Sequence, residues 1–157
     1  MSKLIFRSHY HPDNVCNPVI PRKAYPSDIG YDLTLVREVK TLNENTVMYD
    51  SSISVIPPFG YYIEIVPRSS LSKYGYMMAN SIGIVDPSYQ GTLKVVMTKV
   101  VDSAESILLP LTRFQLILRK IHDCDTEVQY IESDDNNNNA EIVEYMTRGT
   151  GGFGSTD

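Results

Sequence analysis

Apolar and polar side chains alternate along several short stretches of this chain, with the period of two that half-buried β-strands show. Residues 31–36 alternate in this way, and residues 61–66 and 93–101 are rich in β-branched or aromatic side chains. Clusters of Pro, Gly, Asp and Ser separate these stretches and mark turns. The pattern predicts strands over residues 4–7, 31–36, 61–66, 93–101, 114–121 and 127–131, the first of them an edge strand.

Short strands separated by turns favour an all-β fold, a jelly-roll-like β-sandwich, over a β-α-β arrangement. One short helix is predicted over residues 69–74, where Ser69 or Ser70 could cap the first turn and Gly75 could end the last. Composition agrees with this fold class. Val, Ile, Thr, Tyr and Phe make up about a third of the 157 residues, whereas Ala occurs four times.

The C-terminal residues differ in composition from the rest. Residues 133–139 read Ser-Asp-Asp-Asn-Asn-Asn-Asn, with no apolar side chain to bury, and residues 148–157 contain four glycines. We therefore expect a β domain over residues 1–132, a polar Asn-rich linker over residues 133–147 and a mobile Gly-rich lid over residues 148–157. A disordered tail without a role explains the glycines equally well when they are considered alone.

Charge and cysteine content narrow the classes of function. The net charge of −5 and a pI near 5.1 disfavour binding to nucleic-acid polymers, although a small anionic ligand needs only a local cationic site. No apolar stretch reaches the roughly 18–20 residues of a transmembrane helix, and residues 1–7 lack a secretory signal. Two cysteines indicate free thiols in a reducing compartment, so we expect a soluble intracellular protein, cytoplasmic or nuclear.

Two segments in the first half of the chain carry polar groups that could take part in chemistry: the first carries two carboxylates and the second is a possible phosphate cradle. In residues 28–33, Asp28 and Asp32 flank Gly30 at the start of a strand, and a plain turn capped by Asp28 is the simpler interpretation. In residues 67–71, Arg68 and Ser69 stand at a helix start, where free N–H groups favour anions. A capped helix with a surface arginine explains that second segment about as well.

Residues 80–91 look like a hairpin that could bind a nucleoside. Backbone groups beside Asn80 could read a base, the ring of Tyr89 could pack on a sugar, and Asp86 could take a proton from water. A turn that begins at Asp86-Pro87, followed by a core tyrosine, is the alternative.

The C-terminal segment offers a guanidinium at Arg148 and a ring at Phe153 among glycine N–H groups, which suits a lid over a phosphate-bearing ligand. It follows no strand and opens no helix, so it is not a dinucleotide fingerprint. A metal site at His9, His11 and Asp13 is disfavoured because zinc spacing is missing, and Cys124 lacks an oriented base.

In this order, the segments resemble the five motifs of the homotrimeric dUTPase family, whose fold is a jelly-roll-like β-clip. The matches, from the first motif to the fifth, are residues 28–33, 67–71, 83–91, 113–117 and 148–156. Each match alone is weak, but five in order, with the fifth complete, are specific. Three positions depart from the pattern. Ser70 replaces a common glycine, Ser88 replaces a frequent acid, and Thr112 lies where the fourth motif usually has the arginine that here is Arg113.

The resemblance implies hydrolysis of dUTP to dUMP and pyrophosphate, which limits uracil in DNA and supplies dUMP for dTMP synthesis. Asp86 would activate the attacking water, and Arg148 would act as a finger on the terminal phosphates. Mg²⁺ would bridge the phosphates, with Asp32 supporting it through water or orienting a neighbouring arginine.

The resemblance also implies substrate-binding residues. The phosphate chain would be held by Arg68, Ser69, Ser70 and Gln115. The uracil would be read by Asn80, Gly83 and Val85 and covered by Phe153, with Gly154, Ser155 and Thr156 as further binding positions. Tyr89 would exclude a 2′-hydroxyl. In the family three chains build each site, so a homotrimer with shared active sites is implied, without nucleic-acid or membrane partners.

The dCTP deaminases share this fold and are the second choice. Their usual Arg-Ser-Ser-Leu form is present at residues 68–71, but their catalytic Glu would fall at Val96 and their catalytic Arg at Lys73. A dUTPase-like regulatory module without turnover is a third possibility. A structural jelly roll is a fourth, and it would not need the Gly-rich tail.

Overall fold

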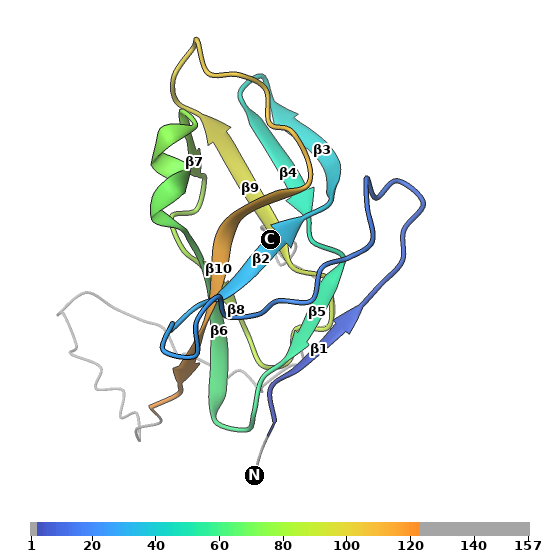
Figure 1. The fold of residues 1–157 in the computed structure, drawn as a ribbon, viewed down its shortest axis with the longest axis vertical. Coiled ribbons are helices and arrows are strands. Elements are labelled where there is room, and N and C mark those ends of the chain that lie inside the picture. The colour runs from blue at the N-terminus through green and yellow to red at the C-terminus, as the bar shows by residue number, and fades with distance from the viewer. Residues whose placement is uncertain (1–2, 123–157) are drawn as a thin grey trace, which may run out of the picture.

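Ten β-strands and one short 3₁₀ helix form residues 3–122, the part of the chain that the computed structural model describes (Figure 1). In chain order they are β1 (Ile5–Ser8), β2 (Tyr31–Leu35), β3 (Arg37–Asn43), β4 (Thr46–Asp50), β5 (Ile53–Ile56), β6 (Tyr61–Pro67), η1 (Ser69–Lys73), β7 (Tyr76–Met78), β8 (Gly83–Val85), β9 (Lys94–Lys99) and β10 (Leu111–Lys120). The predicted strand at 127–131, the linker and the lid lie outside the described residues.

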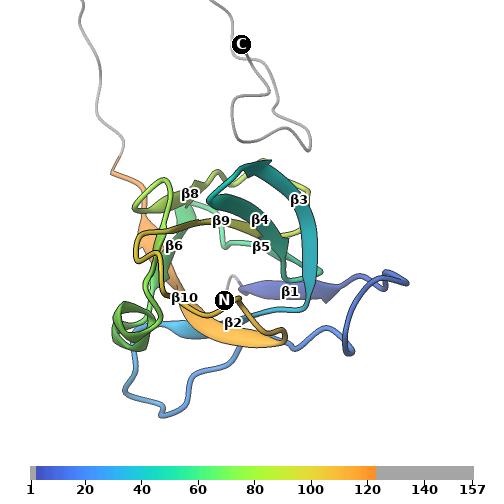
Figure 2. The same ribbon diagram turned by 90° about the horizontal axis from the view of Figure 1, so that it is seen from above.

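Two four-stranded sheets carry the fold. Their strand orders are β2-β10-β6-β8 and β3-β4-β9-β7, and β1 and β5 form a separate two-stranded ribbon. Every pairing between these strands is antiparallel. Seen from above, the strands surround a common centre (Figure 2). The predicted all-β, jelly-roll-like sandwich with one short helix is confirmed.

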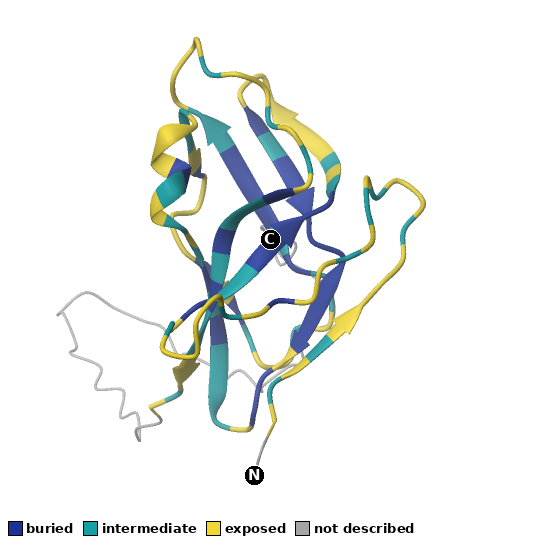
Figure 3. Cartoon of the chain, in the orientation of Figure 1, coloured by how far each residue is buried: buried dark blue, intermediate teal, exposed yellow. Residues whose placement is uncertain are grey.

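Alternation along the strands places the core between the sheets. In β6, Ile63 and Ile65 are buried while Glu64 between them points outward, and in β10 Phe114 and Leu116 are fully buried. Strand β9 instead buries Val95, Val96 and Met97 consecutively, so both of its faces are covered (Figure 3). Such a continuous apolar stretch marks a central strand rather than an edge.

The hairpin predicted over residues 80–91 is wrong. Strand β8 pairs with β6, whereas the next strand, β9, pairs with β4 and β7 in the other sheet. Pro87 has no N–H to continue a ladder, and the N–H of Tyr89 donates to the carbonyl of Asp86 and closes a turn. The chain therefore leaves the first sheet after Val85 instead of folding back on itself.

The helix lies where it was predicted, but its caps differ. Arg68 occupies the N-cap, with no side-chain capping bond, and Ser69 and Ser70 lie inside the helix, so the predicted serine cap is wrong. Strand β6 pairs with β10 as far as Pro67, which leaves Arg68 as the turning residue. Gly75 follows with φ +72°, the left-handed conformation expected after a helix.

Candidate functional site

Three adjacent strands bring together the polar residues of the predicted phosphate site. Gln115 of β10 lies opposite Asp32 of β2 on one side and Val66 of β6 on the other. Arg68 follows β6 directly, and its backbone N–H donates to the carbonyl of Arg113 at 2.8 Å. Residues far apart in sequence therefore share one corner of the β2-β10-β6-β8 sheet.

An ion pair joins two of these residues. Arg68 Nη1 lies 2.9 Å from Asp32 Oδ2, and the two side chains are 37% and 27% exposed, so both reach the solvent. The carboxylate holds the guanidinium in one orientation, which prepares it to meet an anion. Ser69 is exposed and Ser70 half-buried in the first turn of η1, beside this pair in the chain.

Because Gly30 has no side chain, the amide group of Gln115 can occupy the space beside it. A Cβ at position 30 would lie 2.1 Å from Gln115 Oε1, so a larger residue would push the amide away. Asp28 instead stabilises the turn before β2, because its Oδ2 accepts a hydrogen bond from the backbone N–H of Tyr25 at 2.9 Å. The turn interpretation therefore fits Asp28, whereas Asp32 belongs to the corner.

The segment between β7 and β8 presents backbone groups. Asn80 is exposed, and Ser81 has φ +60°, a left-handed conformation that turns the chain sharply. Gly83 packs against Met78 and Ile65, where a Cβ would approach within 3.0–3.3 Å, and Val85 is buried in the core. Gly83 and Val85 could therefore contribute only backbone groups to a ligand.

Asp86 and Tyr89 belong to the turn that follows β8. Asp86 is half-buried, and its carbonyl accepts the N–H of Tyr89. The hydroxyl of Tyr89 donates to the carbonyl of Thr92 at 3.0 Å, and the ring leaves no room for a side chain at Gly91. Burial, together with the nearby Asp50 carboxylate, raises the pKa of Tyr89 above its usual value. The tyrosine is held by both its ring and its hydroxyl.

Sequence reasoning missed a buried charge cluster behind this turn. Asp50, at the end of β4 and 1% exposed, accepts from Arg37 Nη2 at 2.6 Å and from the hydroxyl of Thr92 at 2.9 Å. Lys94 of β9 donates to the same hydroxyl at 3.0 Å. Thr92 thus connects the cluster to Tyr89. The only signal in the sequence was an acid that directly follows an apolar stretch.

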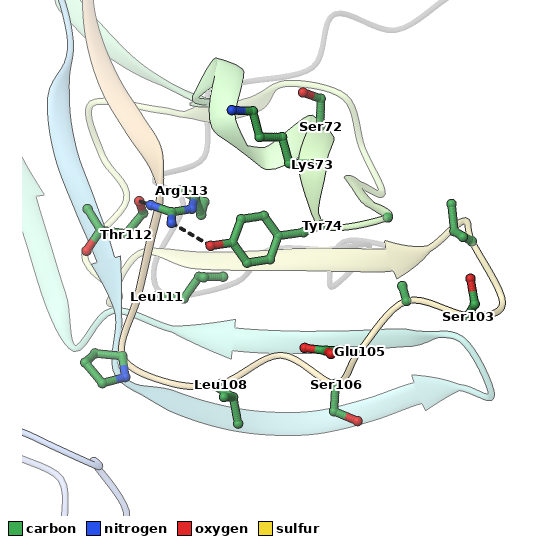
Figure 4. Close-up of a pocket in the computed structure, with 14 residues that line it drawn as sticks. Ser72, Lys73, Tyr74, Ser103, Glu105, Ser106, Leu108, Leu111, Thr112 and Arg113 are labelled. Atoms are coloured by element: carbon green, nitrogen blue, oxygen red, sulfur yellow. Dashed lines mark hydrogen bonds between the residues drawn. The ribbon is translucent and has the colours of Figure 1, made fainter.

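Two cavities flank η1. The larger, about 800 Å³, is lined by Lys73, Tyr74, Glu105 and Arg113 among others, and none of the predicted site residues within residues 3–122 lines it (Figure 4). The smaller, about 310 Å³, lies between Arg68 and Ser81 and therefore adjoins both the phosphate corner and the β7–β8 segment.

The remaining expectations concern metal-binding side chains, membrane-spanning helices and the C-terminal site residues. Within residues 3–122 no three His, Cys, Asp or Glu side chains gather as a metal-binding group, and His9 bonds to the hydroxyl of Ser54 instead. No helix in this range has the length and apolar character needed to cross a membrane. Cys124 and the C-terminal site residues lie outside the described residues; the latter are Arg148, Phe153, Gly154, Ser155 and Thr156.

Known proteins provide an independent comparison. The sequence model of the dUTPase family matches residues 17–157. The deoxyuridine 5′-triphosphate nucleotidohydrolase of Thermobifida fusca is 32% identical over 138 residues, which cover 87% of this chain and 72% of that protein.

Two solved structures are similar in fold. The dUTPase of Streptococcus mutans has a TM-score of 0.65 at 19% identity, over 77% of this chain and 98% of that one. A mutant dUTPase from phage phi11 of S. aureus, solved to show the coordination of a structural Mg(II) ion, has a TM-score of 0.63 at 18% identity, over 83% and 99%. The chain belongs to the dUTPase family.

Proposed function

We propose that this chain hydrolyses dUTP to dUMP and pyrophosphate. The observation that carries the proposal is the match to the dUTPase family over residues 17–157, which spans all five motifs. The corner of Asp32, Arg68 and Gln115 supports it, because an oriented guanidinium and an amide suit an anionic triphosphate.

The main barrier is the attack of water on a crowded, negatively charged α-phosphorus, so catalysis requires positioning and charge neutralisation. Arg68, Ser69, Ser70 and Gln115 would hold the phosphates, and Arg148 would add positive charge from the C-terminal segment. Asp32 would keep Arg68 in its productive orientation, in line with the 2.9 Å ion pair. Asp86 would accept the proton of the attacking water.

The residues present fit a magnesium ion that is held mainly by the substrate. Mg²⁺ prefers oxygen ligands, retains waters and is often bound through one or two carboxylates plus substrate phosphates. The corner supplies one carboxylate, Asp32, which already accepts from Arg68, so a contact through water suits it better than direct ligation. When bound, the ion would neutralise charge on the phosphates. The phage phi11 relative coordinates a structural Mg(II) ion.

Selectivity would come from the β7–β8 segment and the turn after it. Asn80 and the backbone of Gly83 and Val85 would read the uracil edge, and Phe153 would cover the base, with Gly154, Ser155 and Thr156 beside it. Tyr89, held by Thr92 and packed over Gly91, would leave no space for a 2′-hydroxyl. We further propose a homotrimer in which these groups come from different chains.

Deamination of dCTP finds no support among the described residues. Val96, where the deaminase glutamate would fall, is an apolar side chain buried in β9, and Lys73, in place of the arginine, is exposed at the end of η1. Neither position supplies the group that the reaction needs.

The test is to incubate the full chain with dUTP, dCTP and Mg²⁺ and to measure pyrophosphate and ammonia. Pyrophosphate from dUTP is expected, and ammonia from dCTP would favour the deaminase. Asp86→Asn should lower turnover by roughly 10²–10⁴-fold while largely keeping dUTP binding, because the substitution removes the base and nearly keeps the shape of the side chain. Asp102→Asn, an exposed loop acid, is the matched control. Binding without turnover in the unmodified chain would indicate a regulatory module.

A further inference from the structure

Strand β10 holds η1 at both ends through a single residue. At the start, the carbonyl of Arg113 accepts the backbone N–H of Arg68 at 2.8 Å. At the end, Arg113 Nη2 donates to the hydroxyl of Tyr74 at 2.6 Å, and the guanidinium carbon lies 4.9 Å from the centre of that ring (Figure 4). A hydrogen bond and a cation–π contact therefore both join Arg113 to Tyr74.

The other restraints on this helix include its packing beside β7 and the backbone N–H groups of Val100 and Val101, which donate to the carbonyl of Gly75 just after the helix. The helix has five residues, 3₁₀ geometry and no side-chain cap at its N-terminus, so its own bonds are too few to hold it. Leu71 is the one residue of η1 buried in the core. The cavities of about 800 and 310 Å³ lie along its flanks, where packing would otherwise restrain it.

We propose that Arg113 is a positioning residue for phosphate binding. Its hydrogen bond and cation–π contact with Tyr74 hold η1 in place, and η1 in turn sets the orientation of Arg68 and Ser69. This inference rests on the proposed function. The neighbouring Thr112 cannot share the task, because its hydroxyl pairs with that of Thr34 in β2 at 2.8 Å. Of Thr112 and Arg113, only Arg113 therefore contacts the end of η1 through its side chain.

The inference separates two parts of the substrate. Arg68 and Ser69 would meet phosphates, whereas the uracil would be read by the β7–β8 segment. Loosening η1 should therefore weaken ligands that carry phosphate and leave the nucleoside unaffected. A general loss of structure would weaken both kinds of ligand together.

The experiment uses the full chain with Mg²⁺ and compares Arg113→Gln, Arg113→Lys and Tyr74→Phe. Steady-state kinetics give kcat and KM for dUTP, and competition gives inhibition constants for pyrophosphate and for 2′-deoxyuridine. Arg113→Gln should raise both the KM for dUTP and the constant for pyrophosphate about tenfold, as expected for loss of a charge-assisted hydrogen bond. Tyr74→Phe and Arg113→Lys should cause smaller changes in the same direction, and the constant for 2′-deoxyuridine should stay within about twofold.

Arg119→Gln is the matched control, because Arg119 lies on the same strand and pairs with Glu64 at 2.8 Å, away from η1. The inference is overturned if Arg113→Gln changes these constants no more than Arg119→Gln does, or weakens 2′-deoxyuridine as much as pyrophosphate. If Arg113→Gln does not fold, Tyr74→Phe at its exposed position decides in the same way. An unmodified chain that leaves dUTP intact would instead contradict the proposed function, and this inference with it.

Discussion

Gly30 and Gln115 show how one side chain depends on the absence of another. The amide of Gln115 occupies the space where any larger residue at position 30 would place its Cβ, only 2.1 Å from Oε1. The amide is the far end of a flexible side chain and can rotate away, and Gln115 Cβ, 3.0 Å from the added atom, needs to shift by only a few tenths of an ångström, so the cost to the fold is small. What would be lost is its direction toward the corner that holds Asp32 and Arg68.

We therefore expect Gly30→Ala to fold normally but to bind dUTP more weakly. The KM should rise about tenfold, the effect of misplacing one hydrogen-bonding group, while the melting temperature changes little. Steady-state kinetics and thermal denaturation test this. Gly60→Ala is the control, because nothing lies within 4 Å of its Cβ and its φ of +79° makes the substitution a purely conformational cost. The idea fails if Gly30→Ala lowers stability and leaves the KM unchanged.

Strands β3, β4 and β9 are joined by the buried cluster around Asp50. Arg37, Lys94 and Thr92 all contact or approach this one carboxylate, which is itself 1% exposed. A carboxylate that far from water persists only because each oxygen is satisfied, and the N–H of Ser52 serves the second oxygen at 2.7 Å. The cluster therefore ties the turn containing Tyr89 to the centre of the fold.

Asp50→Ala should be among the most destabilising single changes in the described part of the chain. It leaves the half-buried Arg37 cation without its partner, which costs about 3–5 kcal/mol. Urea denaturation measures the loss. Asp13→Ala, which removes an acid that is 76% exposed and lies 3.6 Å from His11, should stay within about 0.5 kcal/mol. Equal effects of the two substitutions would mean that the Asp50 cluster contributes nothing special.

Across the folded chain, buried tyrosines link stability to alkaline pH. Burial raises the pKa of Tyr49 to about 12, with Glu38 and Tyr76 adding to the effect. The unfolded chain releases this proton near its usual value of 10.0, while the folded chain keeps it. Stability is therefore unaffected below about pH 10 and falls as the pH rises toward 12.

The free energy of unfolding, measured in urea between pH 8 and 11, should decline above about pH 10 and decline less steeply in Tyr49→Phe. Tyr10→Phe, at a side chain that is 82% exposed, should behave like the unmodified chain. A Tyr49→Phe chain with an unchanged alkaline slope would contradict the assignment.

The proposed homotrimer with shared sites can be tested by mixing two variants. A chain truncated before Arg148 keeps the proposed base, Asp86, but lacks the proposed lid segment, and full-length Asp86→Asn keeps that segment but lacks the proposed base. If each site draws on different chains, mixtures of these two proteins, each with much reduced turnover, should recover part of the activity after subunit exchange. Light scattering and mass spectrometry would verify the exchange. No recovery despite exchange would mean that each chain closes its own site.

Several features could be read from the sequence because they depend on local chemistry. Alternating side chains predicted the strands near residues 31–36, 61–66 and 114–121, and Gly75 marked the end of η1. The family resemblance, rather than local chemistry, singled out Arg68 and Gln115 as phosphate-binding residues and Asp32 as a support for the metal or for a neighbouring arginine, and the structure brings these three residues to one corner. The strands that were not predicted are β3, which is mostly exposed, β4 and β5, which are buried almost throughout, and β7, which has three residues. Strand β8 lies in the first arm of the predicted hairpin, but it pairs with β6 instead of with the second arm.

Other features arise only when distant segments meet. Nothing near residue 83 in the chain says that β8 pairs with β6 rather than with its own continuation. Likewise, the buried Asp50 is stabilised by Arg37 and Thr92, which lie elsewhere in the chain. Arg113 contacts the end of η1 from another strand. Secondary-structure propensity and turn chemistry depend on a few neighbouring residues, so the elements they determine can be predicted from the order of residues along the chain. Pairing, burial and ion-pair partners depend on free energies that exist only once residues tens of positions apart have come into contact.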